Sequence, residues 1–183
     1  DQDFRIPKGQ RATKDRIEAE IDLSSAFALA AVAAVNGSAT FLDFPRESLQ
    51  PDAGFVTILQ TMGVPITSQA SGLTVAKSAR LNGVAVNLKT MPDLFPVLCV
   101  LCALAEGESD LYGAPHLVHK ESNRLERGVE LARLLGRDVL AKEDGAVFRG
   151  ASARTPGPGF EFDCENDHRL AFAAAVAKAA GHN

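Results

Sequence analysis

Two short charged motifs stand where the sequence changes from polar to helical character. Residues 120–124 (KESNR) precede a segment with helical periodicity, and residues 166–169 (NDHR) open an apolar run. Arg124, like His168 and Arg169, therefore falls at the start of a predicted helix. A cation in the first helical turn opposes the helix dipole by about 0.3–1 kcal/mol. Such a position favours either a bound anion or a structural pair with a nearby acid, and finding two in one chain favours a carboxylate or phosphate ligand.

Other catalytic signatures are absent from the sequence. It contains no glycine-rich phosphate loop, Walker motif, HExxH, EF-hand loop or Gly-x-Ser-x-Gly elbow. The sequence has four histidines, His116, His119, His168 and His182, and their spacing is not that of metal ligands. We therefore expect no metal site, and serine-hydrolase chemistry has no support.

Three cysteines could suggest redox chemistry, but their setting favours the protein core. Cys99 and Cys102 form a CxxC pair inside the apolar run 97–104, with no second CxxC nearby. Because a free cysteine packs as a small hydrophobe, burial is favoured over a metal or redox role. The odd count, completed by Cys164, is typical of a reducing compartment, so we expect a cytoplasmic protein.

The composition is that of an ordinary globular protein. The chain has 183 residues, of which 46% are hydrophobic, so a disordered chain or a disulfide-stapled miniprotein is excluded. The net charge of −4, from 19 basic and 23 acidic residues, disfavours nucleic-acid or anionic-membrane partners. The longest uncharged apolar run, 26–35, is too short to span a bilayer.

An internal repeat organises the elements that must position the charged motifs. Three segments share a polar or acidic cap, an apolar helix and a closing glycine. The helices are predicted at 26–35, 94–105 and 170–180. Their acidic caps would be Asp22, Asp93 and Asp167. Because each helix is apolar nearly all round, we expect the three to be buried, packed together and surrounded by sheets.

The first two segments continue in the same way. A strand, an amphipathic helix ending in glycine, and a hairpin with Ser-Gly or Asp-Gly at its turn follow each apolar helix. Leading strands are predicted at 16–21, 84–88 and 160–164. The sequence therefore predicts a single α+β domain, 1–183, built from repeated β-α-β-α-β-β units. The units would cover about 16–80, 81–150 and 159–183, the last of them truncated.

The three aspartates also have a purely structural interpretation. A carboxylate at an N-cap accepts hydrogen bonds from free backbone N–H groups and meets the positive end of the helix dipole. Capping and chemistry therefore remain equally open for Asp22, Asp93 and Asp167. Asn123, with Glu126 as its reciprocal acid, would cap the amphipathic helix of the second unit in a related way.

Taken together, the motifs resemble the enolpyruvyl transferases, and most closely the 5-enolpyruvylshikimate-3-phosphate synthases. The matching stretches are 22–34 (DLSSAFALAAVAA), 92–93 (PD), 119–136 (HKESNRLERGVELARLLG) and 166–173 (NDHRLAFA). They lie in order along nearly the whole chain, and KES-x-R together with NDHR is specific. The family has two domains of three βαβαββ units each, the inverse α/β fold, which agrees with the repeat. The resemblance implies that this chain is most of the carboxy-terminal domain.

The resemblance also implies an activity. These enzymes transfer the enolpyruvyl group of phosphoenolpyruvate to the 5-hydroxyl of shikimate 3-phosphate, release phosphate and need no cofactor. The reaction requires a base, an acid and cations around anionic substrates. By resemblance, Asp93 would accept the hydroxyl proton, Lys120 would hold the shikimate hydroxyls, and Glu121 would carry the methylene proton.

The remaining roles concern the charged groups of the substrates. Arg124 and Arg169 would hold the phosphoenolpyruvate carboxylate, a planar task that suits arginine. His168 would lie near the departing phosphate, and His116 would take the position of a contact to the shikimate phosphate. Asp22 would mainly cap its helix.

Several departures from the family pattern leave alternatives open. His116 lies in a stretch where relatives usually have Asn and often Arg, Asn123 replaces the commoner Asp, and Leu170 replaces Met. The family's amino-terminal domain and its carboxy-terminal Lys loop are outside this sequence. We therefore expect the chain alone to be inactive and to bind substrate weakly. The alternatives are a UDP-N-acetylglucosamine enolpyruvyl transferase or a non-catalytic scaffold domain of the same fold.

Overall fold

The computed structural model describes residues 5–13, 15–45, 47–150 and 159–182. The first repeat unit folds as α1 (Leu23–Asn36), β1 (Ser38–Leu42), the 3₁₀ turn η1 (Pro51–Gly54), α2 (Phe55–Thr61), β2 (Ile66–Gln69) and β3 (Gly72–Ala76). The second folds as β4 (Ala85–Asn87), η2 (Pro92–Leu94), α3 (Phe95–Leu104), β5 (Ser109–Tyr112), η3 (Pro115–His119), α4 (Arg124–Leu134), β6 (Asp138–Lys142) and β7 (Gly145–Arg149). The third unit contributes α5 (His168–Ala179).

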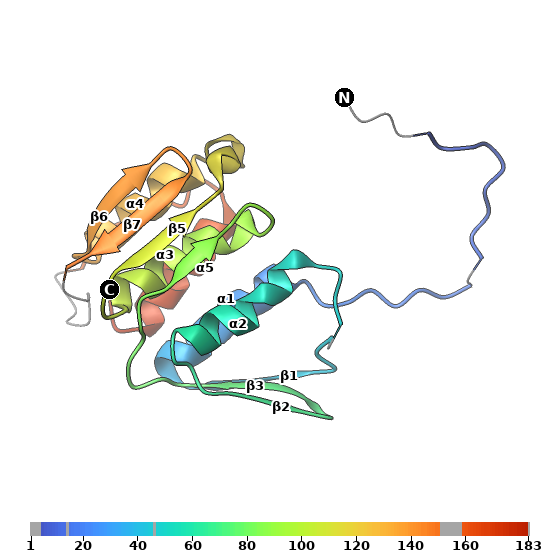
Figure 1. Ribbon diagram of the computed structural model, residues 1–183, viewed down its shortest axis with the longest axis horizontal. Coiled ribbons are helices and arrows are strands. Elements are labelled where there is room, and N and C mark those ends of the chain that lie inside the picture. The colour runs from blue at the N-terminus through green and yellow to red at the C-terminus, as the bar shows by residue number, and fades with distance from the viewer. Residues whose placement is uncertain (1–4, 14, 46, 151–158, 183) are drawn as a thin grey trace.

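The two sheets repeat one topology around the central helices (Figure 1). In the first sheet the order is β1-β3-β2, with antiparallel neighbours throughout. In the second the order is β4-β5-β7-β6, where β5, β7 and β6 pair antiparallel and β4 joins β5 in parallel. The α+β class and the repeat are thus confirmed, including both hairpins and both amphipathic helices.

The predicted leading strands are the exception. Only the one in the second unit forms, as β4, whereas 16–21 and 160–164 are not strands. A strand needs a hydrogen-bonding partner, and β4 finds it in β5, which follows α3. Among the described residues no strand follows α5, and 160–164 pairs with no strand there. Residues 16–21 would have to pair with the edge of β1, but their apolar side chains, Ile17 and Ile21, stay exposed and give little reason to do so.

The three apolar helices pack together as predicted, but their burial is unequal. Every residue of α3 is buried, and α1 is buried apart from one side on which Leu29 is 62% exposed. Helix α5 packs against both of them yet leaves Ala171, Ala175 and Lys178 exposed. The expectation that all three helices are buried on every side is therefore wrong for α5, since the described residues form two sheets and no third sheet that could cover it.

Helix α4 approaches α3 closely at one small residue. A Cβ atom added to Gly128 would lie 2.8 Å from Phe95 Cε1 and 2.9 Å from Cys99 Sγ. Because such contacts are shorter than van der Waals packing allows, only glycine fits without movement of α3 or α4. This contact sets how near the start of α4 comes to the start of α3.

The cysteine pair lies in the core, as its apolar context predicts. Cys99 and Cys102 on α3 are fully buried. Burial raises the pKa of Cys102 to about 12 and that of Cys99 well above its ordinary value, so both remain neutral thiols. No helix in the described ranges combines the length and the apolar character needed to cross a bilayer.

Candidate functional site

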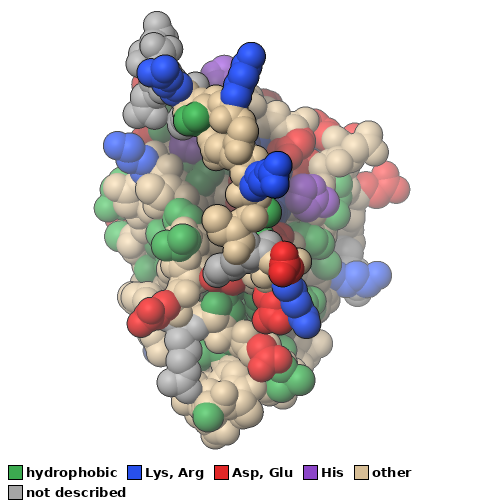
Figure 2. All heavy atoms as spheres, turned by 90° about the vertical axis from the view of Figure 1, so that its right-hand side faces the viewer, with side chains coloured by type: hydrophobic (Ala, Val, Ile, Leu, Met, Phe, Trp, Pro, Cys, Tyr) green, Lys and Arg blue, Asp and Glu red, His purple; other side chains and the backbone are tan. Residues whose placement is uncertain are grey.

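The N-terminal ends of α1, α3, α4 and α5 meet on one side of the chain, the face shown in Figure 2, where acidic, basic and histidine side chains gather. Eight charged residues interact there, seven from these ends and Asp52 from η1, which precedes α2, and we call them the helix-end cluster. They are Asp22, Asp52, Asp93, Lys120, Glu121, Arg124, Asp167 and Arg169. Helix starts separated by up to about 150 residues in sequence thus share one network of charges.

Arg124 is the centre of the helix-end cluster. Its side chain is only 1% exposed, and all three guanidinium nitrogens donate to carboxylates. Nη1 lies 2.9 Å from Asp93 Oδ1, Nη2 lies 2.5 Å from Glu121 Oε2, and Nε lies 2.8 Å from Asp167 Oδ2. The cation in the first turn of α4 is therefore paired with three acids: Glu121, just before α4, Asp93 in η2, and Asp167 at the start of α5. This is the structural pairing that the sequence left open for Arg124.

Asp167 joins the capping of α5 to the binding of Arg124. Its side chain is fully buried, and Oδ1 accepts from the backbone N–H of Arg169 at 2.9 Å, which makes it the N-cap. Its other oxygen accepts from Arg124 and from the hydroxyl of Ser122 at 2.9 Å. One carboxylate therefore fixes the start of α5 against the start of α4.

Asp93 has a different task from the other two aspartates. It lies in η2, makes no capping hydrogen bond to a helix N-terminus, and is 32% exposed. Its Oδ1 contacts Arg124, and it also contacts Lys120 Nζ at 3.3 Å. Its Oδ2 lies 3.5 Å from Arg169 Nη2. The capping interpretation thus holds for Asp22 and Asp167 and is wrong for Asp93, which presents a carboxylate to three cations.

Arg169 is a buried cation of the helix-end cluster that keeps donors without a hydrogen-bond partner. Its side chain is 9% exposed, and Nε and Nη1 are buried without a hydrogen-bond partner. Only Nη2 lies near acids, at 3.5 Å from Asp93 and 3.8 Å from Asp22 Oδ2. A buried guanidinium with unsatisfied donors costs free energy until an acceptor arrives. This geometry suits an incoming anion.

Asp22 and Asp52 border Arg169 from the first repeat unit. Asp22 caps α1 by accepting from the backbone N–H of Ser24 at 3.2 Å. Asp52 lies in η1, with Oδ1 buried and without a hydrogen-bond partner. Burial, followed by the charge of Asp93, raises the pKa of Asp52 above its ordinary value. Sequence reasoning missed Asp52, although Pro51-Asp52 and Pro92-Asp93 are the same dipeptide at the same place before a helix.

The ionisation of the buried pair at the centre is set by opposing effects. Burial lowers the pKa of Arg124, but its hydrogen bond to Asp167 and the charges of Asp167, Glu121 and Asp93 outweigh burial and raise it. Burial raises the pKa of Asp167, but hydrogen bonds from Arg124, the Arg169 backbone and Ser122 outweigh this and lower it. Both groups are therefore charged at neutral pH.

The two histidines among the predicted site residues lie apart from these ion pairs. His116 is half-buried in η3, the turn that leads to Lys120. His168 is exposed at the first position of α5, where its ring meets Phe172 edge-on at 5.8 Å. The structure thus brings together Asp93, Lys120, Glu121, Arg124 and Arg169, while the histidines flank them.

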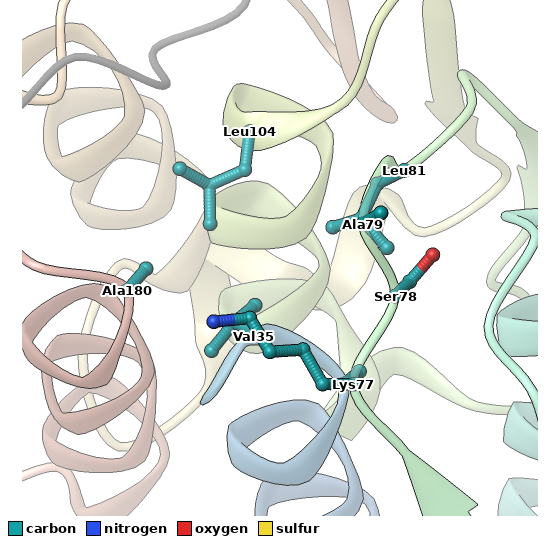
Figure 3. Close-up of a pocket in the computed structure, with 8 residues that line it drawn as sticks. Val35, Lys77, Ser78, Ala79, Leu81, Leu104 and Ala180 are labelled. Atoms are coloured by element: carbon teal, nitrogen blue, oxygen red, sulfur yellow. The ribbon is translucent and has the colours of Figure 1, made fainter. Parts of the chain in front are cut away.

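The described residues offer this site no metal-binding group. Within that part of the chain, no set of three or more His, Cys, Asp or Glu side chains is placed to hold a metal ion. A separate hollow of about 220 Å³ lies at the other ends of the helices, bordered by Val35, Leu104 and Ala180, with Lys77 extending across it (Figure 3). It contains none of the cluster residues. The chemistry available at the helix-end cluster is therefore proton transfer by carboxylates and recognition of anions by Arg and Lys.

Comparisons with known proteins point to one group of relatives. A family model described as EPSP synthase (3-phosphoshikimate 1-carboxyvinyltransferase) matches residues 1–182. The chain is 38% identical over 174 residues to the 3-phosphoshikimate 1-carboxyvinyltransferase of Syntrophobacter fumaroxidans, and 33% identical over 174 residues to that of Methanocorpusculum labreanum. These matches cover 94% and 95% of this chain but only 40% of each relative.

A solved structure agrees with this. An EPSP synthase from Acinetobacter baumannii superposes with a TM-score of 0.77 at 26% identity, covering 88% of this chain and 40% of the other. The chain thus spans about two fifths of the length of the proteins it matches.

Proposed function

Because the chain belongs to the EPSP synthase family, we propose that the helix-end cluster is the part of a 3-phosphoshikimate 1-carboxyvinyltransferase site supplied by this segment. The full-length protein would transfer the enolpyruvyl group of phosphoenolpyruvate to the 5-hydroxyl of shikimate 3-phosphate and release phosphate. The remaining domain would supply the other half of the site. No cofactor is invoked, and both substrates are small anions.

The observation that carries this proposal is the state of Arg169. Its Nε and Nη1 are buried without a hydrogen-bond partner, and its third nitrogen, Nη2, lies 3.5 Å from Oδ2 of Asp93, the candidate base. A carboxylate that accepts from Nη1, or from Nε on the other edge of the guanidinium, would satisfy one of these donors. It would also bring phosphoenolpyruvate within a few ångströms of the carboxylate that must take the hydroxyl proton, as general base catalysis requires.

Arg124 has a second role in this proposal. Each of its three nitrogens already donates to a carboxylate and its side chain is only 1% exposed, so the substrate carboxylate would bind it in place of an existing partner. Glu121 is the partner most easily released, since its side chain is 57% exposed whereas that of Asp167 is fully buried. Release from Arg124 would free Glu121 to carry the proton to and from the methylene carbon.

Asp93 and Lys120 would act on the second substrate. The contacts of Asp93 with Lys120 and Arg124 hold its carboxylate in a fixed orientation, which a general base needs. Lys120, 29% exposed, would turn toward the hydroxyls of shikimate 3-phosphate. His168 would approach the departing phosphate from the start of α5, and His116 would contact the shikimate phosphate from η3.

The test uses the full-length protein that contains this segment. Wild-type protein should release phosphate from phosphoenolpyruvate only in the presence of shikimate 3-phosphate. Arg169→Ala should raise KM for phosphoenolpyruvate by about 100-fold, because a hydrogen-bonded charged contact is worth about 1.5–3 kcal/mol. Its effect on KM for shikimate 3-phosphate should be smaller.

The matched control is Arg149→Ala. Arg149 lies on β7, away from the helix-end cluster, and pairs with Glu108. It should leave both KM values unchanged. Absence of phosphate release by wild-type protein, or equal effects of the two variants, would contradict the proposal.

A further inference from the structure

The chain makes a sharp corner just before α5. Glu165 and Asn166 have φ angles of +48° and +57°, the left-handed region that side chains other than glycine rarely occupy. Two consecutive residues in this conformation cost free energy, and for Glu165 no special preference offsets it. The residues that follow are Asp167 and Arg169, both members of the helix-end cluster. The corner therefore sets the direction in which α5 begins, and with it the positions of Asp167 and Arg169.

Contacts within the corner define its shape but not its place. The backbone N–H of Glu165 donates to Asp163 Oδ1 at 2.8 Å, and that of Asp167 donates to the Cys164 carbonyl at 2.7 Å. Both bonds join residues inside the same turn. They leave the turn free to shift as a unit relative to α4.

Arg127 is the side chain that ties this turn to α4. Its Nη2 donates to the carbonyl oxygen of Asp163 at 2.5 Å, and its Nε lies 3.4 Å from Glu165 Oε1. Its guanidinium also stacks over the ring of Phe162, 4.8 Å from the ring centroid. Three residues of the turn are thus held by one arginine, which is itself 16% exposed and oriented by a hydrogen bond from Nη1 to Glu130.

Arg124 and Arg127 act on the two sides of the same corner. They are three residues apart, so their side chains leave the same face of α4. Arg124 holds Asp167, which follows the corner. Arg127 holds Phe162 and Asp163, which precede it, and contacts Glu165 within it. With both in place, the strained corner is fixed at each end to one rigid helix.

We propose that Arg127 is a positioning residue for the reaction, holding the 162–165 turn so that Arg169 meets the substrate carboxylate in the correct place. The inference rests on the proposed function, but Arg127 itself touches no substrate. It extends the site to a residue outside the helix-end cluster. A displacement of about 1 Å in a substrate-binding group can cost about 100-fold in rate, so the loss of this tie should be measurable.

The experiment compares three variants of the full-length protein. Arg127→Ala should raise KM for phosphoenolpyruvate about 10-fold or more while KM for shikimate 3-phosphate changes less than 2-fold. Arg127→Lys, which keeps the charge but loses the planar fork, should recover part of that loss. Arg133→Ala, on the exposed side of the same helix, is the matched control and should change neither KM.

Hydrogen exchange provides a readout that does not need activity. Peptides covering 160–170 should exchange faster in Arg127→Ala than in wild type, and should be unchanged in Arg133→Ala. If the exchange accelerates but no variant, wild type included, turns over substrate, the proposed function fails while the structural tie stands. If Arg127→Ala leaves either the exchange or KM for phosphoenolpyruvate unchanged in an active enzyme, the inference is overturned.

Discussion

At the scale of single residues, Arg124 shows how a buried charge becomes tolerable. Removing a guanidinium from water costs several kcal/mol, which attraction recovers only when each donor meets an acceptor in good geometry. Here Asp93, Glu121 and Asp167 supply the acceptors from three different parts of the chain. The pairing therefore stabilises the relative placement of the helix starts, and it makes each partner costly to remove.

Asp167→Ala tests this dependence on complete pairing. The variant leaves Arg124 buried with fewer partners and removes the N-cap of α5, so the free energy of unfolding should fall by about 3–5 kcal/mol. Urea unfolding followed by circular dichroism measures this. Asp22→Ala is the control, because it removes a cap that is 55% exposed, and it should cost only about 1 kcal/mol. If both variants lost the same free energy of unfolding, the buried Arg124–Asp167 pair would contribute no more to stability than an exposed cap.

The pKa of Asp167 predicts how stability depends on pH. Although burial raises it, the hydrogen bonds from Arg124, Arg169 and Ser122 lower it overall. Below about pH 4 the unfolded chain therefore takes up this proton before the folded chain does, so the free energy of unfolding should fall as pH decreases. Asp167→Asn should flatten this part of the curve of urea midpoint against pH.

Asp52 is the informative comparison, because its pKa is shifted in the opposite direction from that of Asp167. Its pKa is raised by burial and by the charge of Asp93, so its ionisation destabilises the fold as pH rises. Asp52→Asn should raise the urea midpoint at pH 7. A decrease at pH 7 would mean that Asp52 is paired favourably in the folded protein.

The sequence predicted the composition of the site better than its internal pairing. Arg124 and Arg169 were identifiable because cations are unusual in a first helical turn, and the family motifs supplied Asp93, Lys120 and Glu121. The choice between ligand binding and structural pairing depended on which acids come near, and this is a property of tertiary structure. For the same reason Asp52 was missed, since a Pro-Asp pair before a helix gives no local sign of its neighbours.

At the scale of helices and strands, local patterns were sufficient wherever an element could find its partner nearby. The hairpins formed because each supplies its own antiparallel neighbour, as in β2–β3 and β6–β7. Residues 160–164 pair with no strand in the described part of the chain, and periodicity alone cannot reveal whether a partner strand is near. The exposed side of α5 has the same cause.

Gly128 provides a test of the packing between α3 and α4. In an open helix Gly→Ala would stabilise by up to about 1 kcal/mol. Here the added methyl would press on Phe95 and Cys99, so Gly128→Ala should instead destabilise by about 1–3 kcal/mol. Thermal and urea unfolding measure the sign. Leu134→Ala, at a position 41% exposed on the same helix, should change stability by less than about 1 kcal/mol, and a stabilising effect of Gly128→Ala would refute the close contact.

At the scale of the whole molecule, the proposed function assigns this chain only part of the reaction site. It spans 40% of the length of its relatives. We predict that the isolated 183-residue chain does not release phosphate from phosphoenolpyruvate and shikimate 3-phosphate, whereas the full-length protein does. A phosphate-release assay on both, at equal concentration, measures this. Turnover by the isolated chain would show that the second domain is dispensable.

The charge balance of the helix-end cluster has a kinetic consequence. Five carboxylates, Asp22, Asp52, Asp93, Glu121 and Asp167, face three cations, Lys120, Arg124 and Arg169. When all are ionised, their formal charge is −2, so from a distance this side repels a polyanion, and attraction begins only at contact range. On the proposed function, we therefore expect a phosphorylated substrate to make its first contact elsewhere in the full-length protein and to engage this surface second. Added salt, which screens repulsion, would hasten that second engagement.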